Sequence, residues 1–212
     1  MNVTRFPVNS FVECTYLLWI CEGGDAVLVD PGMMRDDERK MIDDFITMHY
    51  LNVKYVLLTH IHIDHVTSAK WASEKYGAII AGCEHEERYG AFLPQQAEHF
   101  RLKIEVEPLK LDKYLKDKDV ISIGDEEIHV LYTPGHSNGS LSFYAPMSSI
   151  VLTGDALFAG SIGRTDLPGG DFDTLISSIR MKLFTLPSDT MVYPGHGPAT
   201  TIGDEMRYNP YL

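Results

Sequence analysis

Four short apolar segments of this chain each end in a turn that carries histidine or aspartate. The first segment, 54–59, runs directly into His60-x-His62-x-Asp64-His65. Residues i and i+2 of an extended backbone point to the same face, so His60 and His62 point together, and a bend into a helix brings Asp64 and His65 in from another side. Four imidazole and carboxylate side chains within six residues predict a site for a divalent metal ion.

Three further turns follow the same design later in the chain. Each places one ligand-type residue directly after a glycine at the end of a predicted strand, and these residues are His136, Asp155 and His196. Ligands drawn from several strand ends can converge on one rim, and seven of them exceed the four of a closed structural zinc site. The surplus predicts two metal ions bridged by a carboxylate and a solvent molecule, as in metal-assisted hydrolysis.

Hydrophobic periodicity predicts two groups of strands with helices around them. Helical spacing is present at 36–50, at 65–76 and after Asp171, whose side chain we expect to cap the helix. The expected strands are 11–20, 26–30, 54–59, 78–81, 120–123, 128–132, 141–145, 150–153 and 190–193. For 84–118 we expect a short helix and an extended loop, and after the last strand a short tail. The pattern favours an α/β fold with two sheets packed face to face and helices outside.

Two of the expected helices carry an apolar face. In the helix at 36–50, Met41, Phe45 and Met48 share one face, and Ile42 and Ile46 lie beside it. In the helix after Asp171, the expected face consists of Phe172, Leu175, Ile176, Ile179 and Leu183. These faces are expected to pack against the sheets.

Length and charge exclude several classes of protein. The chain has 212 residues, and at about 150 residues per domain one large domain is favoured. Its net charge of −12, without a Lys/Arg cluster, argues against nucleic acid, whose phosphates it would repel. No apolar run approaches the about 20 residues of a membrane span. Cys14, Cys21 and Cys83 form no C-x-x-C pair, which is typical of free thiols in a reducing cytoplasm, where we expect the protein.

The order of these motifs resembles the metallo-β-lactamase superfamily. The similarity extends from the hairpin end Val29-Asp30-Pro31-Gly32, through the histidine cluster, to Pro194-Gly195-His196-Gly197, which is nearly the whole chain. It implies a four-layer αββα sandwich formed by a single domain, 1–212, with the metal ions at one edge. It also implies two divalent ions, with zinc as the first choice and iron or manganese as alternatives.

The resemblance implies a role for each ligand-type residue. One metal ion would be held by His60, His62 and His136, and the second by Asp64, His65 and His196, with Asp155 bridging the two. Asp64 would also be catalytic, because it would orient the nucleophilic oxygen. Asp30 is expected near the site as an acceptor that orients a ligand histidine.

Within the superfamily, segments 154–166 and 200–205 are similar to the glyoxalase II and persulfide dioxygenase branch, and single-domain bacterial hydrolases resemble the chain most. Glyoxalase II itself has an additional C-terminal helical domain, which we do not expect here because only a short tail follows His196. Arg164-Thr165-Asp166 also replaces the Lys-Phe-Tyr of that enzyme. Arg164 is nevertheless expected to bind a substrate carboxylate.

The resemblance implies hydrolysis of a thioester of the S-lactoylglutathione type, giving a hydroxy acid and a thiol, by a hydroxide that bridges the metal ions. A thiol with a pKa of about 8.5 is a good leaving group and needs no strong general acid, and no obvious acid is present beyond the ligands. The expected partner is this small molecule, not nucleic acid or a membrane, and the protein is expected to be a monomer or small homo-oligomer.

Two other functions remain open at this point. A persulfide dioxygenase would use His60, His136 and one more ligand, with Asp155 favoured, around a single iron ion, leaving positions for oxygen and thiol. A non-catalytic, metal-bound scaffold would bind a partner through the same fold. The number and identity of the metal ions would separate the hydrolase from the dioxygenase.

Overall fold

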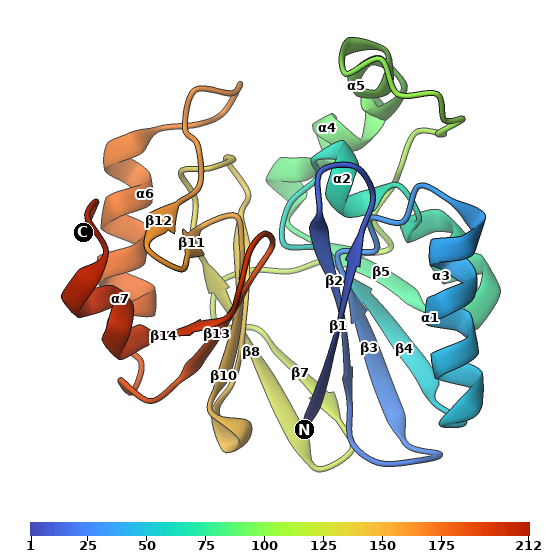
Figure 1. The fold of residues 1–212 in the computed structure, drawn as a ribbon, viewed down its shortest axis with the longest axis horizontal. Coiled ribbons are helices and arrows are strands. Elements are labelled where there is room, and N and C mark those ends of the chain that lie inside the picture. The colour runs from blue at the N-terminus through green and yellow to red at the C-terminus, as the bar shows by residue number, and fades with distance from the viewer. The chain divides into compact units, whose positions relative to one another are not determined.

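The computed structural model describes all residues, 1–212, and they form two compact units, Met1–Tyr114 and Leu115–Leu212. Each unit is built on a six-stranded sheet with helices packed against it (Figure 1). Alternating and continuous apolar runs produce these strands, because a buried strand face needs an apolar residue at every second position.

The sheet of the first unit has the strand order β1-β2-β3-β4-β5-β6. The strands are β1 (Asn2–Val8), β2 (Glu13–Trp19), β3 (Asp25–Val29), β4 (Asn52–Leu57), β5 (Ile79–Gly82) and β6 (Lys113–Tyr114). Neighbours from β1 to β3 pair antiparallel, and those from β3 to β6 pair parallel. The parallel strands therefore end at the same edge, and the segment after β4 carries the histidine cluster.

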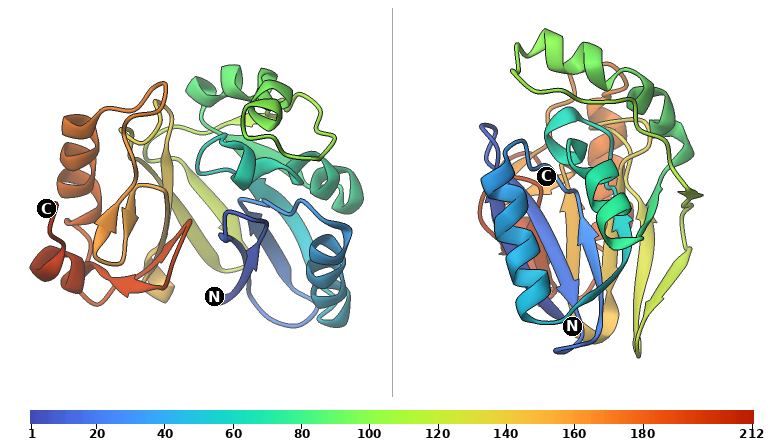
Figure 2. Two further views of the ribbon diagram at one scale, coloured as in Figure 1. Left: turned by 45° about the horizontal axis from the view of Figure 1, so that its top comes forward. Right: turned by 90° about the vertical axis from the view of Figure 1, so that its right-hand side faces the viewer.

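Helices of the first unit connect its parallel strands. They are α1 (Asp36–Met48), α2 (Ile63–Val66), α3 (Ala69–Tyr76), the 3-10 turn η1 (Glu84–Glu86), α4 (Glu87–Ala91) and α5 (Leu93–His99). Figures 1 and 2 show α1 and α3 against one face of the sheet. Ile42 and Ile46 of α1 and Ala72 of α3 are buried there with Leu28 and Val56 of the strands.

The sheet of the second unit has the order β14-β13-β10-β9-β8-β7, and β11 and β12 form a separate hairpin. Its strands are β7 (Val120–Ile123), β8 (Glu126–Tyr132), β9 (Leu141–Ala145), β10 (Ile150–Gly154), β11 (Leu157–Phe158), β12 (Ser161–Ile162), β13 (Met191–Pro194) and β14 (Thr200–Thr201). Its helical segments are η2 (Pro146–Ser148), α6 (Phe172–Ser178), the π-helical η3 (Ile179–Leu183) and α7 (Ile202–Tyr208). Parallel pairing of β10 with β13 brings the turns after both strands to one edge.

Several expectations from the sequence are confirmed. The helix at 36–50 is α1, and the strands expected at 11–20 and 26–30 correspond to the antiparallel pair β2 and β3. Asp171 caps α6, since its side chain accepts a hydrogen bond from the backbone nitrogen of Thr174 at 2.8 Å.

Other elements differ from the expectation. The helix predicted at 65–76 is two helices, α2 and α3, which are separated where the Ser68 hydroxyl donates to the carbonyl of Met33 at 2.6 Å. The segment 84–118 contains η1, α4, α5 and β6 rather than one short helix, and the short tail contains α7. Strand β1 was not predicted, and Phe172, expected on an apolar face, is 48% exposed.

The helices of this structure are all too short or too polar to cross a membrane.

Candidate metal centre

In the first unit, three imidazole rings of the histidine cluster lie against one another. The ring centroid of His60 lies 4.6 Å from that of His62 and 4.2 Å from that of His65. His62 has extended backbone and is followed by α2, so the chain turns into a helix directly after it. The turn brings Nε2 of His65 within 3.8 Å of a carboxylate oxygen of Asp64. The first unit therefore gathers the four predicted ligands His60, His62, Asp64 and His65 around one turn.

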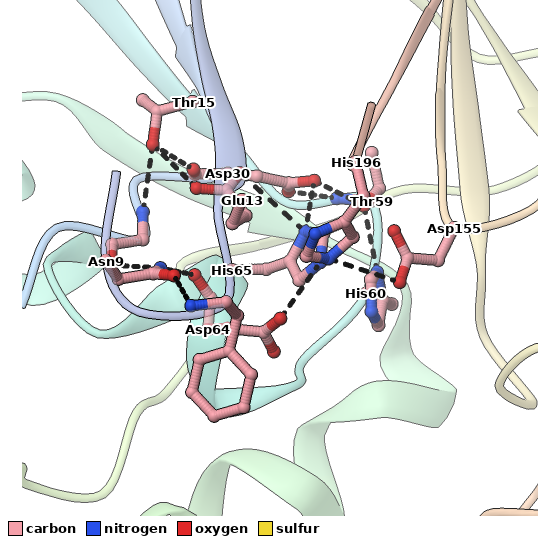
Figure 3. Close-up of polar contacts among 12 residues, drawn as sticks. Asn9, Glu13, Thr15, Asp30, Thr59, His60, Asp64, His65, Asp155 and His196 are labelled. Atoms are coloured by element: carbon pink, nitrogen blue, oxygen red, sulfur yellow. Dashed lines mark hydrogen bonds and ion pairs between the residues drawn. The ribbon is translucent and has the colours of Figure 1, made fainter. Parts of the chain in front are cut away.

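Asp30 lies against this cluster and holds it through three hydrogen bonds (Figure 3). Its carboxylate accepts from the backbone nitrogen of Thr59 at 2.7 Å, from the Thr59 hydroxyl at 2.5 Å and from Nδ1 of His65 at 3.1 Å. Asp30 is 2% exposed and has φ +47, a left-handed conformation that aspartate tolerates better than most residues. The sequence-based expectation that Asp30 contacts a histidine of the cluster is confirmed.

These hydrogen bonds determine which ring nitrogen of two histidines carries a proton. A carboxylate only accepts, so Nδ1 of His65 donates to Asp30. The Thr59 hydroxyl uses its single proton on Asp30, so it accepts from Nδ1 of His60 at 3.0 Å. In neutral imidazole the other nitrogen then has a lone pair, and Nε2 of both His60 and His65 is the atom able to bind a metal ion.

In the second unit, Asp155 lies between His136 and His196. Its Oδ2 atom is 3.7 Å from Nε2 of His136 and 3.6 Å from Nε2 of His196, and Figure 3 shows Asp155 beside His196. Both distances exceed a hydrogen bond, yet they are close to the about 3.4 Å that separates ligands of a tetrahedral ion at about 2.1 Å. Nδ1 of His136 donates to the carbonyl of Arg164 at 2.8 Å, which again leaves Nε2 for a metal.

Glycines let these turns approach their neighbours. A Cβ at Gly135, which has φ +129, would lie 2.3 Å from the Cα atom of Leu175 in α6. A Cβ at Gly163 would lie 1.8 Å from the carbonyl oxygen of Asp155. Glycine is therefore required at both positions, directly before His136 and beside Asp155.

The donor atoms of each unit fit a divalent cation. Imidazole nitrogen and carboxylate oxygen, without thiolate, are ligands that zinc, iron and manganese all accept. The two sets are His60, His62, Asp64 and His65 in the first unit and His136, Asp155 and His196 in the second. The predicted substrate ligand, Arg164, is exposed and pairs through Nε and Nη2 with both carboxylate oxygens of Asp166, each at 2.7 Å.

Sequence reasoning missed a group of residues that hold the backbone of the cluster. Nδ2 of Asn9 donates to the carbonyl of Gly32 at 2.8 Å and to that of Asp64 at 2.9 Å. Glu86 accepts from the backbone nitrogen of Ile61 at 2.9 Å, and the Gln96 side chain accepts from that of Ile63 at 3.0 Å. Their partners are backbone groups far away in sequence, which local spacing does not reveal.

Glu13 is a further buried carboxyl group near the cluster. It is fully buried, it accepts from the Thr15 hydroxyl at 3.0 Å, and its Oε1 atom lies 3.9 Å from Nδ1 of His65. Burial raises the pKa of the Glu13 carboxyl well above its ordinary value, although His65 acts in the opposite direction.

Comparison with known proteins assigns the family. Residues 12–196 match the family described as Metallo-beta-lactamase superfamily. The chain belongs to the metallo-beta-lactamase superfamily. The predicted family is thereby confirmed, and membership identifies the chain as a metal-binding hydrolase of this superfamily.

Two curated relatives of this superfamily member match its full length. Hydroxyacylglutathione hydrolase GloC of Haemophilus influenzae is 37% identical over 100% of this chain and 98% of its own length. The probable metallo-hydrolase YqgX of Bacillus subtilis is 35% identical, again over 100% of this chain and 98% of its own.

Solved structures confirm the metallo-β-lactamase fold of this superfamily member. TTHA1623 in a di-iron-bound form has a TM-score of 0.86 and 34% identity, covering 99% of this chain and 100% of that one. The B3 metallo-beta-lactamase BLEG-1 also has a TM-score of 0.86, with 32% identity over 100% and 99% of the two chains. ETHE1 from Myxococcus xanthus has a TM-score of 0.78 and 28% identity over 99% and 84%.

Proposed function

We propose that this superfamily member hydrolyses thioesters of the S-lactoylglutathione type. The observation that supports this substrate class is the full-length similarity to a hydroxyacylglutathione hydrolase, at 37% identity. The histidine tautomers support metal-dependent hydrolysis, because Nε2 of His60, His65 and His136 is left to bind a cation.

The proposal assigns the seven predicted ligands to one pair of cations. Motif order in the superfamily supports one ion on His60, His62 and His136, a second on Asp64, His65 and His196, and Asp155 between them. Zinc is the proposed metal, since the donors are imidazole and carboxylate. A relative whose structure is titled as di-iron-bound makes iron the first alternative to test.

The side chains of this chain have separate tasks in the proposed reaction. Two divalent cations, when bound, supply Lewis acidity that makes water a nucleophile near neutral pH and polarises a carbonyl group. Asp64, whose side chain is 16% exposed, accepts a hydrogen bond from the attacking water and orients it. Asp30 and Thr59 keep the protons of His65 and His60 on Nδ1. The thiol leaves without a dedicated acid, because its pKa is near about 8.5.

Arg164 is the proposed binding residue for an anionic part of the substrate. Its guanidinium group is already held in a bidentate pair by Asp166, and this pair orients it toward solvent, where 58% of the side chain is exposed. A second carboxylate can share the remaining N–H donors of a guanidinium group.

A persulfide dioxygenase with one iron ion is the second candidate. The similarity to ETHE1, at 28% identity over 99% of this chain, leaves this reaction open. Within the second unit, His136 and Asp155 lie close enough to bind the same ion. A single iron ion with open positions suits the activation of oxygen.

Metal content and two assays test the proposal. We expect about two zinc ions per chain by elemental analysis, hydrolysis of S-lactoylglutathione, and no thiol-dependent oxygen uptake. Asp155→Ala should lose both metal and activity, whereas the control His129→Ala, in β8, should retain both. One iron ion per chain with oxygen uptake would establish the dioxygenase instead. Normal metal content without hydrolysis of any thioester in a broad panel would reject the substrate class.

A further inference from the structure

Helix α7, in the part of the chain after the last predicted ligand, carries a buried carboxylate. Glu205 is 4% exposed and accepts three hydrogen bonds. The donors are the backbone nitrogen of Gly160 at 2.9 Å, the Thr200 hydroxyl at 2.6 Å and Nδ2 of Asn209 at 2.8 Å. A buried carboxylate is costly unless donors surround it, so this arrangement is a built contact and not a solvated helix face.

Asn209, four residues after Glu205, contacts the same part of the chain. It is 6% exposed, and its Nδ2 atom also donates to the carbonyl of Ser161 at 3.0 Å. Gly160 lies in the turn of the β11–β12 hairpin with φ +66, and Ser161 is the first residue of β12. Glu205 of α7 and Asn209, the residue directly after the helix, thus hold one N–H and one C=O group of the hairpin.

The hairpin and the segment that follows it contact two of the predicted ligand histidines. The ring of Phe158 in β11 packs edge-on against His196, with ring centroids 6.2 Å apart and an interplanar angle of 89°. The chain that leaves β12 carries the carbonyl of Arg164, which accepts from Nδ1 of His136. Gly163, one residue earlier, lies against the carbonyl of Asp155. A displacement of the hairpin would therefore change the positions of all three predicted ligands of the second unit, His136, Asp155 and His196.

We infer that Glu205 and Asn209 are positioning residues for the metal centre, which they hold through the β11–β12 hairpin. The inference rests on the proposed metal-binding role of His136, Asp155 and His196. Residues that orient metal ligands typically change metal affinity about 10–100-fold when they are removed. The side chain of Glu205 bonds Gly160, Thr200 and Asn209 and none of the predicted ligands, so its removal should act indirectly, on metal affinity and on coordination geometry.

The chemistry of the three donors predicts which substitution is tolerated. In Glu205→Gln, the amide oxygen can still accept from Gly160 and Asn209, while the amide nitrogen donates to the Thr200 hydroxyl, which can also accept. The hydrogen bonds from Gly160 and from Asn209, which connect Glu205 to the hairpin, are therefore retained in Glu205→Gln. Glu205→Ala removes them all.

Cobalt titration of the full-length, metal-free chain tests the inference without any substrate. The visible absorption of Co²⁺ reports the coordination geometry, and competition with a chelator gives affinity. We expect Glu205→Ala to weaken Co²⁺ binding at least about tenfold and to shift the spectrum. Glu205→Gln should restore affinity to within about twofold of the unsubstituted chain and restore its spectrum.

A matched variant separates positioning from general loss of stability. Thr201 caps α7 by accepting from the backbone nitrogen of Asp204 at 3.0 Å, and it has no part in the contacts to the hairpin. Thr201→Ala should lower the thermal midpoint and leave the Co²⁺ spectrum and affinity unchanged. If Glu205→Ala does not fold, Asn209→Ala, which leaves the bond from Gly160 to Glu205, is measured in its place, with the same shift expected.

Three results would overturn the inference: a normal Co²⁺ spectrum and affinity in Glu205→Ala, the same change in Thr201→Ala, or no Co²⁺ binding by the unsubstituted chain. The test is also independent of the substrate class. A chain that binds Co²⁺ normally and hydrolyses no thioester refutes the proposed function, while the effect of Glu205 remains measurable.

Discussion

The carboxylate of Asp30 accepts a hydrogen bond from Nδ1 of His65 at 3.1 Å, and the same carboxylate holds both the backbone nitrogen and the hydroxyl of Thr59. One buried side chain therefore sets the position of the strand end before the histidine cluster and the tautomer of a histidine within it. This link makes Asp30 the first residue of the first unit to test by substitution.

Asp30→Asn should weaken zinc binding about 10–100-fold. Asparagine retains the left-handed backbone, but its amide nitrogen faces Nδ1 of His65, so the proton moves to Nε2 and the ligand atom is lost. Competition with a chromophoric chelator measures the affinity. The control is Asp112→Asn, since Asp112 accepts only a backbone hydrogen bond from Ile80. Equal affinities of Asp30→Asn and the unsubstituted chain would contradict this role.

Asn9→Gly should lower the free energy of unfolding by about 1–3 kcal/mol and reduce kcat. Glycine adopts the φ of +53 that Asn9 has, so the loss is confined to the side-chain bonds: those donated to the carbonyls of Gly32 and Asp64, and the one that Oδ1 accepts from the backbone nitrogen of Phe11. Urea unfolding and steady-state kinetics measure the two effects. Ser149→Gly, at another left-handed position, is the control and should not reduce kcat. A stable and fully active Asn9→Gly protein would show that the hydrogen bonds from Asn9 to Gly32 and Asp64 are dispensable.

Gly163→Ala should lower the metal content of the protein, because it displaces the proposed ligand Asp155. The added Cβ would lie 1.8 Å from the carbonyl oxygen of Asp155, so either Asp155 or the hairpin must move. Elemental analysis after purification gives the metal content. Gly77→Ala is the control, because at φ +67 it strains the end of α3 without meeting any atom within 4 Å. Full metal content in Gly163→Ala would mean that the backbone can shift at no cost to the ligands.

Arg164→Ala should raise KM for S-lactoylglutathione about tenfold or more and leave kcat nearly unchanged, since it removes uniform binding. The carbonyl that holds His136 belongs to the backbone and survives the substitution. Arg180→Ala, on η3, is the control. An unchanged KM would show that Arg164 does not bind the substrate and only pairs with Asp166.

Titration of Asp166 should not change KM within a normal assay range, because Asp166 stays ionised in its pair with Arg164. Hydrogen bonding to Arg164 lowers the pKa of Asp166 to about 2, so the carboxylate stays ionised throughout a normal assay range. The pair would be lost only as pH falls below the ordinary pKa of 3.8 toward about 2. Carboxyl chemical shifts in an acid titration measure this pKa, and a midpoint near 4 would contradict the pair.

Glu13→Gln should flatten the pH dependence of stability in the metal-free protein. Burial raises the pKa of Glu13 above the ordinary 4.5, so above that pH the unfolded chain loses a proton that the folded chain keeps. Stability of the unsubstituted chain should therefore fall as pH rises, relative to Glu13→Gln. Urea unfolding in a chelator between about pH 5 and pH 8 measures the difference. Parallel curves for the two proteins would refute the raised pKa.

Local periodicity predicted helices better than it predicted their buried faces. In α1, two adjacent stripes satisfy helical spacing, yet Ile42 and Ile46 are buried while Met41 and Met48 are 42% and 70% exposed. Which stripe faces the sheet depends on the packing of the strands, which the helix sequence does not contain. Helix α7 was missed for a related reason, because its short apolar pattern has little meaning without the hairpin it packs on.

The candidate ligands were predictable because their chemistry is carried by residue type at strand ends. Apart from Asp30, the residues that hold these ligands in place were not predictable, since they act through backbone groups that are distant in sequence. Gln96 bonds a residue 33 positions away, Glu205 one that is 45 away, and Asn9 one that is 55 away. The local sequence around Gln96, Glu205 or Asn9 looks like that around any exposed polar residue. Only the tertiary structure brings each side chain to its backbone partner.

The contacts of Glu86 and Gln96 with the histidine cluster have a practical consequence. Both side chains accept hydrogen bonds from backbone nitrogens, those of Ile61 and Ile63, so the contacts do not depend on the side chains at these two positions. Segment 84–111 can therefore be redesigned at its exposed positions, while Leu93, Ala97, Leu109 and Leu111 stay because they are buried in the core of the first unit. A redesigned segment should leave the cluster undisturbed if it keeps these apolar side chains and provides an acceptor for each of the two N–H groups.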